Sequence, residues 1–442
     1  MKKTALLIAL ACLAHNASAA DLLDILRAAQ DNDPTFAAAK ATLAAGQEKL
    51  PQGRAGLLPN VALSANTTWN DNDITLRSTN TSAPARYNSH GYMVSLSQPL
   101  FRWQNWLSYD QAKIQVAQAE LAFAQARQDL ILRVAQAYFD VLYASESLAA
   151  VRANKTAINQ QLASAKQSFE VGTATITDTH EAQARFDLAQ AQEIAAESDL
   201  EIKQHALQLL IGKAPGSLAG TRPDLELRPP EPRDMATWVA AAEKDALSVQ
   251  NQQSVLALAS READKQQAGH YPTLDLVASK GSNSTLGSLQ IGMMETQVQS
   301  IGVQLNLPLY SGGSTSSRQR EAVAQRGAAE SALEAARRTA AQSARQAYLG
   351  VVNGLAQVKA LKAAQASSQL ALEANKLGYE VGVRINIDVL NAENQVYVTR
   401  RDHAKAVLDT LMAQLRLKAA SGTLSEDDVS AINTLLARST TP

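Results

Sequence analysis

Cysteine is almost absent from the chain. The only one, Cys12, lies in an N-terminal segment, residues 1–19, with the pattern of a secretory signal. Once this segment is removed, no thiol remains for a disulfide, a cysteine metal site or a cysteine nucleophile. Acylation of Cys12 as a lipoprotein anchor is the alternative, but the preceding residues, Ala9-Leu10-Ala11, fit a lipobox poorly.

The signal assignment depends on the order of three features in the first 19 residues. They are a positive start at Lys2 and Lys3, an apolar stretch at Ala5–Leu13, and small residues at Ala17-Ser18-Ala19. This order of charge, apolar core and small-residue cleavage site is typical of secretory signals. We expect cleavage after Ala19, so that the exported chain starts at Ala20.

An excess of positive charge and further long apolar runs are also missing. The chain has 41 Lys+Arg against 42 Asp+Glu, whereas a nucleic-acid binder needs a basic face to displace the counterions of phosphate. Beyond the leader no segment approaches the roughly 18 apolar residues of a transmembrane helix. The exported chain is therefore expected to be periplasmic, extracellular or a membrane β-barrel.

Motifs for catalysis and metal binding are missing as well. His180-Glu181 lacks the second histidine of the zinc motif, because Ala184 and Arg185 follow. Gly312-Gly313 lacks the lysine of a phosphate loop, and no serine lies in a Gly-x-Ser-x-Gly elbow. The other histidines of the exported chain show no ligand spacing; they are His90, His205, His270 and His403. We expect no enzyme activity, no cofactor and no metal site.

What the sequence does contain is an internal repeat with an offset of about 210 residues. Gln136-Ala137-Tyr138 returns as Gln346-Ala347-Tyr348, and Phe169-Glu170-Val171-Gly172 returns as Tyr379-Glu380-Val381-Gly382. Since the order is preserved along the chain, we expect two copies of one unit. The predicted organisation is a first repeat at 20–212, a Pro-rich linker at 213–234, a second repeat at 235–422 and a C-terminal tail at 423–442.

Each repeat is predicted to be mainly helical. Arg102–Val171 contains neither Gly nor Pro over 70 residues, which as a helix would be about 105 Å long. Small or apolar residues recur in it every seven positions, as in Leu107, Ile114 and Leu121, and indicate a coiled coil. We predict long helices at about 102–169 and 314–378, following helices at 173–211 and 383–421, and N-terminal helices at about 22–57 and 236–268.

Four strands are predicted, two before each long helix, at about 59–70, 87–98, 272–280 and 300–308. Val61 and Leu63 alternate with Ala62 and Ser64, as expected of a strand with one polar face. Such segments suit a membrane β-barrel, although a small periplasmic sheet over a core is the alternative. Because four strands cannot close a barrel and lipid tolerates no open edge, the membrane interpretation requires several chains. Three copies would supply twelve strands.

The turns after the two long helices, Phe169–Asp178 and Tyr379–Leu390, resemble the helix-turn-helix tips of the TolC family of outer-membrane efflux and type I secretion channels. The resemblance covers essentially the whole exported chain. It implies a mainly α fold with transmembrane β, in which two repeats of long coiled-coil helices and paired strands build a homotrimer. The trimer would have a twelve-stranded β-barrel in the lipid of the outer membrane and an α-helical tunnel in the periplasm.

The resemblance also implies a function and partners. The protein would be an exit duct for tripartite efflux, type I protein secretion or both, docked to a periplasmic adaptor (membrane fusion) protein. An inner-membrane ABC or proton-driven transporter would supply the energy. A periplasmic or surface structural coiled-coil protein without channel activity is the alternative, but alternating strands at the same point of both repeats speak against it.

By motif position, the resemblance implies a periplasmic gate and two docking tips. The gate residues would be Thr177, Asp178, Tyr379, Arg384, Asp388 and Asn391. Tyr379 would pair with Asp178 and Arg384 with Thr177, while Asp388 would project into the bore as a carboxylate ring. Asn391 stands where well-known members carry a second acidic ring, which puts strong cation binding in doubt; a solvated helix face is the alternative for Asp388.

The docking tips expected to contact the adaptor are Val171, Gly172, Thr173, Val381, Gly382 and Val383. Glycine at each tip tolerates a positive φ and lets another protein approach the backbone. The alternative is that Gly172 and Gly382 are plain helix C-caps, and both interpretations can hold together.

Overall fold

The computed structural model describes residues 20–77, 80–173, 175–222, 225–288 and 292–437. The expected signal segment, 1–19, and the last residues of the expected tail, 438–442, lie outside these ranges. The chain forms two compact units. Unit 1 comprises Met1–Ala41, Ala122–Gln250 and Ala335–Pro442, and unit 2 comprises Thr42–Leu121 and Asn251–Glu334.

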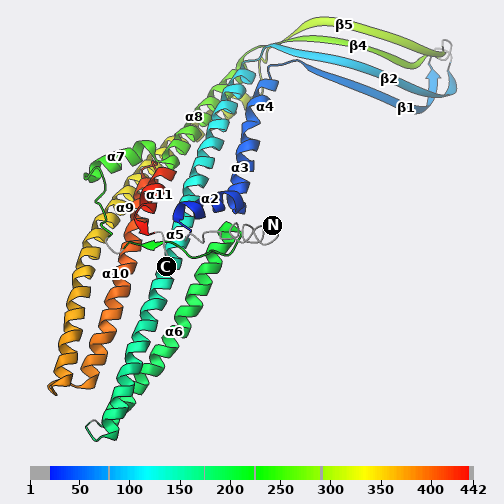
Figure 1. The fold of residues 1–442 in the computed structure, drawn as a ribbon. Coiled ribbons are helices and arrows are strands. Elements are labelled where there is room, and N and C mark those ends of the chain that lie inside the picture. Colours follow the sequence, from blue (N-terminus) through cyan, green and yellow to red (C-terminus); the bar gives the residue numbers. More distant parts are fainter. Residues whose placement is uncertain (1–19, 78–79, 174, 223–224, 289–291, 438–442) are drawn as a thin grey trace, which may run out of the picture. The chain divides into compact units, whose positions relative to one another are not determined.

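Two long helices dominate the element order (Figure 1). Helix α5 spans Trp103–Glu170 and α9 spans Ser314–Glu380, within two residues of the predicted bounds. Each is followed after a short turn by a shorter helix, α6 (Ile176–Ile211) or α10 (Asn386–Ala420). Among the described residues, no helix is both long enough and apolar enough to cross a membrane.

The helical stretch that opens each repeat is broken rather than continuous, which corrects the prediction. In the first repeat it forms α2 (Leu22–Asn32), α3 (Pro34–Gln47) and α4 (Lys49–Ala55). In the second it forms α7 (Met235–Asp245), α8 (Leu247–Gln267) and the 3-10 turn η1 (Ala268–His270). Pro34 explains the first break, because it has no backbone N–H and is suited to the first position of a helix.

Asp33 stabilises the break between α2 and α3. Its Oδ1 accepts a hydrogen bond from the Phe36 N–H at 2.8 Å, and its Oδ2 lies 3.1 Å from Arg133 Nη1. Burial alone would raise the pKa of Asp33, but the hydrogen bonds from Thr35 and Phe36 and the Arg133 guanidinium outweigh it and lower the pKa below its ordinary value. The carboxylate is therefore charged and caps α3.

The main core of unit 1 is built around the middle of α5. Leu130, Val134 and Tyr138 of α5 are each 0% exposed. The residues packed around them come from α2, α6, α10 and a C-terminal helix, α11 (Glu426–Asn433). They include Leu22, Leu26, Leu207, Ile211, Leu411, Leu415, Val429 and Ile432. Burial of these apolar side chains is the main term that stabilises unit 1.

The C-terminal tail expected at 423–442 contains two elements that the sequence analysis did not predict. Helix α11 (Glu426–Asn433) and β6 (Leu436–Ala437) follow α10, and β6 pairs with β3 (Gly220–Thr221) of the linker. Val429 and Ile432 are 1% and 5% exposed in the core. Their spacing puts both on one helix face, so the segment is an amphipathic helix that completes the core.

The repeated Gln-Ala-Tyr motif has a structural role in both copies. The Tyr138 hydroxyl donates a hydrogen bond to the Ala219 carbonyl at 2.7 Å, and the Tyr348 hydroxyl donates to the Arg233 carbonyl. Both acceptors lie in the linker between the repeats. Burial raises the pKa of Tyr138 well above its ordinary value, with the Asp21 carboxylate adding to the effect, so the phenol is protonated and a donor. Each long helix is thus joined to the linker by one tyrosine.

We expect Tyr138→Phe to lower the free energy of unfolding by about 1–3 kcal/mol, because it leaves the buried Ala219 carbonyl without a partner. Tyr348→Phe is the matched control, since the hydrogen bond of Tyr348 is exposed and water can replace it. Thermal unfolding of the two variants, followed by circular dichroism, measures the difference. Equal losses would show that burial of the carbonyl has no role.

Unit 2 contains a four-stranded antiparallel sheet with the order β1-β2-β4-β5 (Figure 1). The strands are β1 (Asn60–Leu76), β2 (Thr81–Phe101), β4 (Thr273–Ser288) and β5 (Gly292–Asn306). All four include most of the predicted segments and extend well beyond them at the ends remote from the helices. The extensions include Asn70-Asp71-Asn72-Asp73, where both faces are polar and no alternation marks a strand.

The register of the sheet separates an apolar face from a polar one. Val61, Leu96, Ala278 and Ile301 form one row across the four strands. The next row, on the opposite face, consists of Ala62, Ser95, Ser279 and Ser300. Large apolar side chains on the first face are exposed, with Ile301 at 79%, although Lys280 also lies on that face. An exposed apolar face of this kind marks a surface that another protein or a membrane covers.

Candidate gate and docking tips

The two predicted tips have the same backbone geometry. Gly172 has φ 77° and Gly382 has φ 79°, in the left-handed region that favours glycine. At the first tip, the Gly172 N–H donates to the Phe169 carbonyl and the Thr173 N–H to the Ser168 carbonyl. The second tip has the matching bonds, from Gly382 to Tyr379 and from Val383 to Gly378. Both glycines therefore close a Schellman motif at the end of a long helix.

Apolar side chains around the two glycines point to solvent in the single chain. Val171, Val381 and Val383 are 70%, 65% and 76% exposed. A side chain added at either glycine would meet nothing within 4 Å, so it is the backbone conformation that requires glycine. The helix-cap interpretation of the glycines thus holds, and the exposed valines leave an apolar surface beside each cap.

Asp178 belongs to a capping box at the start of α6. The Thr175 hydroxyl accepts from the Asp178 N–H at 3.2 Å, and Asp178 Oδ2 accepts from the Thr175 N–H at 3.0 Å. Such reciprocal bonds satisfy two backbone donors of the first helical turn. Thr177, in the same turn, is exposed. Among the described residues, no hydrogen bond joins Asp178 to Tyr379 or Thr177 to Arg384, so these two pairings remain predictions.

Arg384 and Asp388 form an ion pair within the second tip. Arg384 Nη1 lies 3.6 Å from Asp388 Oδ2, one helical turn apart in sequence. The Asp388 side chain is 35% exposed, and the Arg384 side chain is 58% exposed. Because the pair is exposed to solvent, its contribution to stability is small. Its local effect is that the positive charge of Arg384 partly neutralises the predicted carboxylate ring.

Asn391 connects the second helix pair to the first. Its Oδ1 accepts a hydrogen bond from Arg185 Nη2 of α6 at 3.0 Å. Beside it, Leu390 of α10 is 3% exposed and packs between α5 and α6. The side chains around Leu390 are Ile158, Leu162, Ala165, Ala182, Phe186, Ala189 and Ile387. Alanines on α5 and α6 allow α10 to lie close to both helices.

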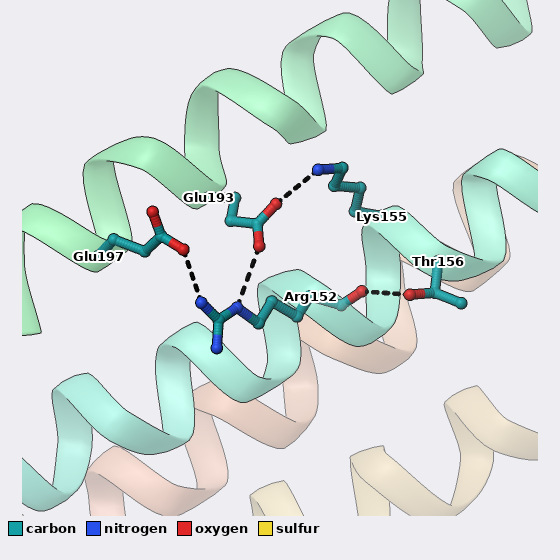
Figure 2. Close-up of polar contacts among 5 residues, drawn as sticks. All are labelled: Arg152, Lys155, Thr156, Glu193 and Glu197. Atoms are coloured by element: carbon teal, nitrogen blue, oxygen red, sulfur yellow. Dashed lines mark hydrogen bonds and ion pairs between the residues drawn. The ribbon is translucent and has the colours of Figure 1, made fainter.

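Helices α5 and α6 are joined by an ion-pair network near this contact (Figure 2). Arg152 of α5 lies 3.0 Å from Glu193 and 2.6 Å from Glu197 of α6, and Lys155 lies 2.7 Å from Glu193. The hydrogen bonds from Lys155 and Arg152 lower the pKa of Glu193 below its ordinary value. The network therefore stays charged at neutral pH and connects the two helices of the first pair.

Three of the polar contacts at this end were not predicted from the sequence. They are the network of Arg152 and Lys155, the ion pair of Lys376 with Glu393, and the hydrogen bond of Gln161 with Asn386. The polar Asn386 between Ile385 and Ile387 was the available signal for the last. Within the described part of the chain, no group of three or more His, Cys, Asp or Glu side chains is placed to hold a metal ion.

The family model described as "Outer membrane efflux protein" matches residues 25–213 and 238–423 of the chain. The chain belongs to this family of outer-membrane channels.

Among characterised relatives, the outer membrane protein TolC of Vibrio cholerae is 34% identical over 437 residues, covering 96% of each chain. The alkaline protease secretion protein AprF of Pseudomonas aeruginosa is 32% identical and covers 94% of this chain and 87% of its own. The proteases secretion protein PrtF of Dickeya chrysanthemi is 31% identical, with 97% and 94% covered.

Solved structures show the same fold at lower identity. The outer membrane protein VceC from Vibrio cholerae superimposes with a TM-score of 0.76 at 19% identity, covering 91% of this chain and 96% of its own. The CmeC outer membrane channel of Campylobacter jejuni gives 0.77 at 18% identity, with 94% and 89% covered. The helical fold is therefore that of outer-membrane channels, and the chain is an outer-membrane protein whose helices extend into the periplasm.

Proposed function

We propose that three copies of the chain close one twelve-stranded barrel in the outer membrane. The observation that carries this proposal is the four-stranded sheet, whose edge strands β1 and β5 have 17 and 15 residues. In lipid, the unpaired backbone groups of two such edges would be prohibitively costly. Pairing β5 of one copy with β1 of the next removes both edges, and three copies give a barrel wide enough for a water-filled channel.

The exposed apolar face supports the same arrangement. In the row from Val61 to Ile301, every side chain is apolar, whereas the neighbouring row on the other face contains three serines. Ser279 Oγ lies 2.8 Å from Ser300 Oγ on that polar face. A membrane barrel has this alternation, with apolar side chains against lipid and polar side chains toward the lumen.

The protein serves as an exit duct for efflux, for type I protein secretion or for both. The family description refers to efflux, and the names of AprF and PrtF refer to the secretion of proteases. A duct needs a polar lumen and a gate but no catalytic group or cofactor. Energy would come from an inner-membrane ABC or proton-driven transporter, joined to the duct by a periplasmic adaptor.

The two tips are the proposed docking sites for the adaptor. Both tips present an exposed valine next to a glycine, Val171-Gly172 and Val381-Gly382, in the same backbone geometry. Apolar side chains beside bare backbone form a surface that another protein can cover closely. Two equivalent tips per chain would give a trimer six such sites.

The gate residues are proposed to surround the bore at the same end. Three copies of Asp388 around one axis would form a carboxylate ring, each carboxylate accompanied by Arg384 at 3.6 Å. Asn391 adds no second charge. We therefore expect the ring to bind multivalent cations, and to bind them more weakly than two acidic rings would, since Coulomb attraction scales with the number of charges.

Ion conduction by the purified protein tests this function. In a planar lipid bilayer we expect discrete channels that open without ATP, and a multivalent cation such as hexamminecobalt added on the side of the tips should block them. Asp388→Ala should weaken the block about tenfold, since three carboxylates are lost. The matched control is Asp187→Ala, because Asp187 is an exposed carboxylate on α6. A protein that inserts no channels would instead support the structural coiled-coil alternative.

A further inference from the structure

Asn386, the first residue of α10, is buried with half of its amide unsatisfied. It is 1% exposed, and its Oδ1 accepts a hydrogen bond from Gln161 Nε2 of α5. Its Nδ2 has no hydrogen-bond partner among the described residues. Exchanging the oxygen and nitrogen of either amide would leave one end unpaired all the same. A buried polar group in this state destabilises the packing that encloses it.

The chain itself buries Asn386, so a second copy cannot reach the amide in this arrangement. The adjacent residues of α10, Ile387 and Leu390, pack into the apolar cluster formed with α5 and α6. Separation of α10 from these helices would expose the Asn386 amide to water. Apolar contact therefore favours the packed arrangement, whereas hydration of the amide favours separation.

Among the described residues, the ionic contacts at this end lie within each helix pair. Arg152 and Lys155 bridge to Glu193 inside the pair α5–α6 (Figure 2), and Lys376 lies 3.2 Å from Glu393 inside the pair α9–α10. The Glu393 side chain is only 5% exposed, which makes this ion pair costly to break. Each pair would thus stay together while the two pairs separate.

Near this end, two polar contacts join one helix pair to the other, and both are weaker than the ion pairs inside each pair. Gln161 with Asn386 is a bond between two neutral amides, and Arg185 with Asn391 is an exposed bond to a neutral acceptor. Neither is an ion pair. The contact that must break for α10 to leave α5 and α6 is thus mainly apolar, with one unsatisfied amide inside it.

We propose that Asn386 is a positioning residue of the gate. Its half-satisfied carboxamide keeps the packed state, with α10 seated against α5 and α6, close in free energy to a state in which α10 has left and water hydrates the amide. This role rests on the proposed function as a gated duct. Asn386, which lies between Ile385 and Ile387, would thus set the balance between the packed and the separated state.

Two substitutions at this position are expected to shift the gate in opposite directions. Asn386→Leu keeps the branched shape at Cγ and removes both polar atoms. Gln161 loses its acceptor but is only half-buried, so water can replace the bond; the packed state gains stability and the open fraction should fall about tenfold. Asn386→Asp has nearly the same shape but would bury a negative charge beside the neutral Gln161 amide, so the open fraction should rise about tenfold or more. Single-channel recording of purified trimers in planar bilayers measures both values.

The matched control is Asn159→Asp, which makes the same change at an exposed position of α5. It should leave the open fraction as in the wild type. Trimer yield and the heat stability of each variant are measured in parallel, because a merely structural role would lower both without moving the open fraction in opposite directions.

The possible outcomes are distinguishable. Opposite shifts in Asn386→Leu and Asn386→Asp support the role of Asn386. If the wild type conducts and both variants match it, or both shift in the same direction, the role of Asn386 is overturned but the proposed function as a duct is not. If the wild type conducts no ions, both the proposed function as a duct and the role of Asn386 in its gate are overturned.

Discussion

Ile301→Arg is expected to abolish the assembled oligomer in the outer membrane. Ile301 is 79% exposed on the apolar face of edge strand β5. An arginine on the lipid face of a barrel costs about 2–4 kcal/mol near the bilayer midplane, and threefold symmetry repeats the cost in each copy. We expect the heat-sensitive oligomer band from outer-membrane extracts to fall at least about tenfold, since every 1.4 kcal/mol is a factor of ten.

Gln304→Arg is the matched control for this substitution. Gln304 lies on the same strand three residues away, pairs with Asp275, and belongs to the opposite, polar face. An arginine there would project into the lumen, where water solvates it, so the oligomer should form in wild-type amount. Similar losses in Ile301→Arg and Gln304→Arg would mean that the two faces do not differ in their surroundings, which would contradict lipid on one face and water on the other.

The helices could largely be predicted because their signals are local. The absence of Gly and Pro over 70 residues places α5 within a residue at each end. The strands were harder to predict, because apolar and polar residues no longer alternate where both faces are polar, as at Asn70–Asp73 in β1. The C-terminal segment was missed as structure because α11 has only eight residues, and its apolar face has meaning only beside the core that it covers.

In the candidate site, too, local features could be predicted and contacts between distant segments could not. The conformations of Gly172 and Gly382 depend only on the turns in which they lie, so both tips could be located from the sequence. The spacing of Thr175 and Asp178 fits a capping box and could have indicated the local role of Asp178. Asn386 could not be assigned, because its burial arises only when α10 packs on α5 and α6, and these helices are more than 170 residues apart in sequence.

Disulfide trapping between the sheet edges tests most directly whether three copies share one barrel. The exported chain is expected to lack cysteine, so Val61→Cys on β1 can be combined in turn with Ile301→Cys, Val303→Cys or Leu305→Cys on β5. Within one chain these edges are three strand spacings apart, about 14 Å, which is too far for a disulfide. Any bond must therefore join different copies.

Val61→Cys with Ala278→Cys is the control, because Ala278 lies on inner strand β4, between β2 and β5, and cannot be reached from another copy. After oxidation of outer membranes, we expect at least one edge pair to form covalent dimers and trimers. The ladder should stop at three copies, and the control should remain monomeric. A ladder that continues past three copies, or edge pairs that all remain monomeric, would contradict the shared twelve-stranded barrel.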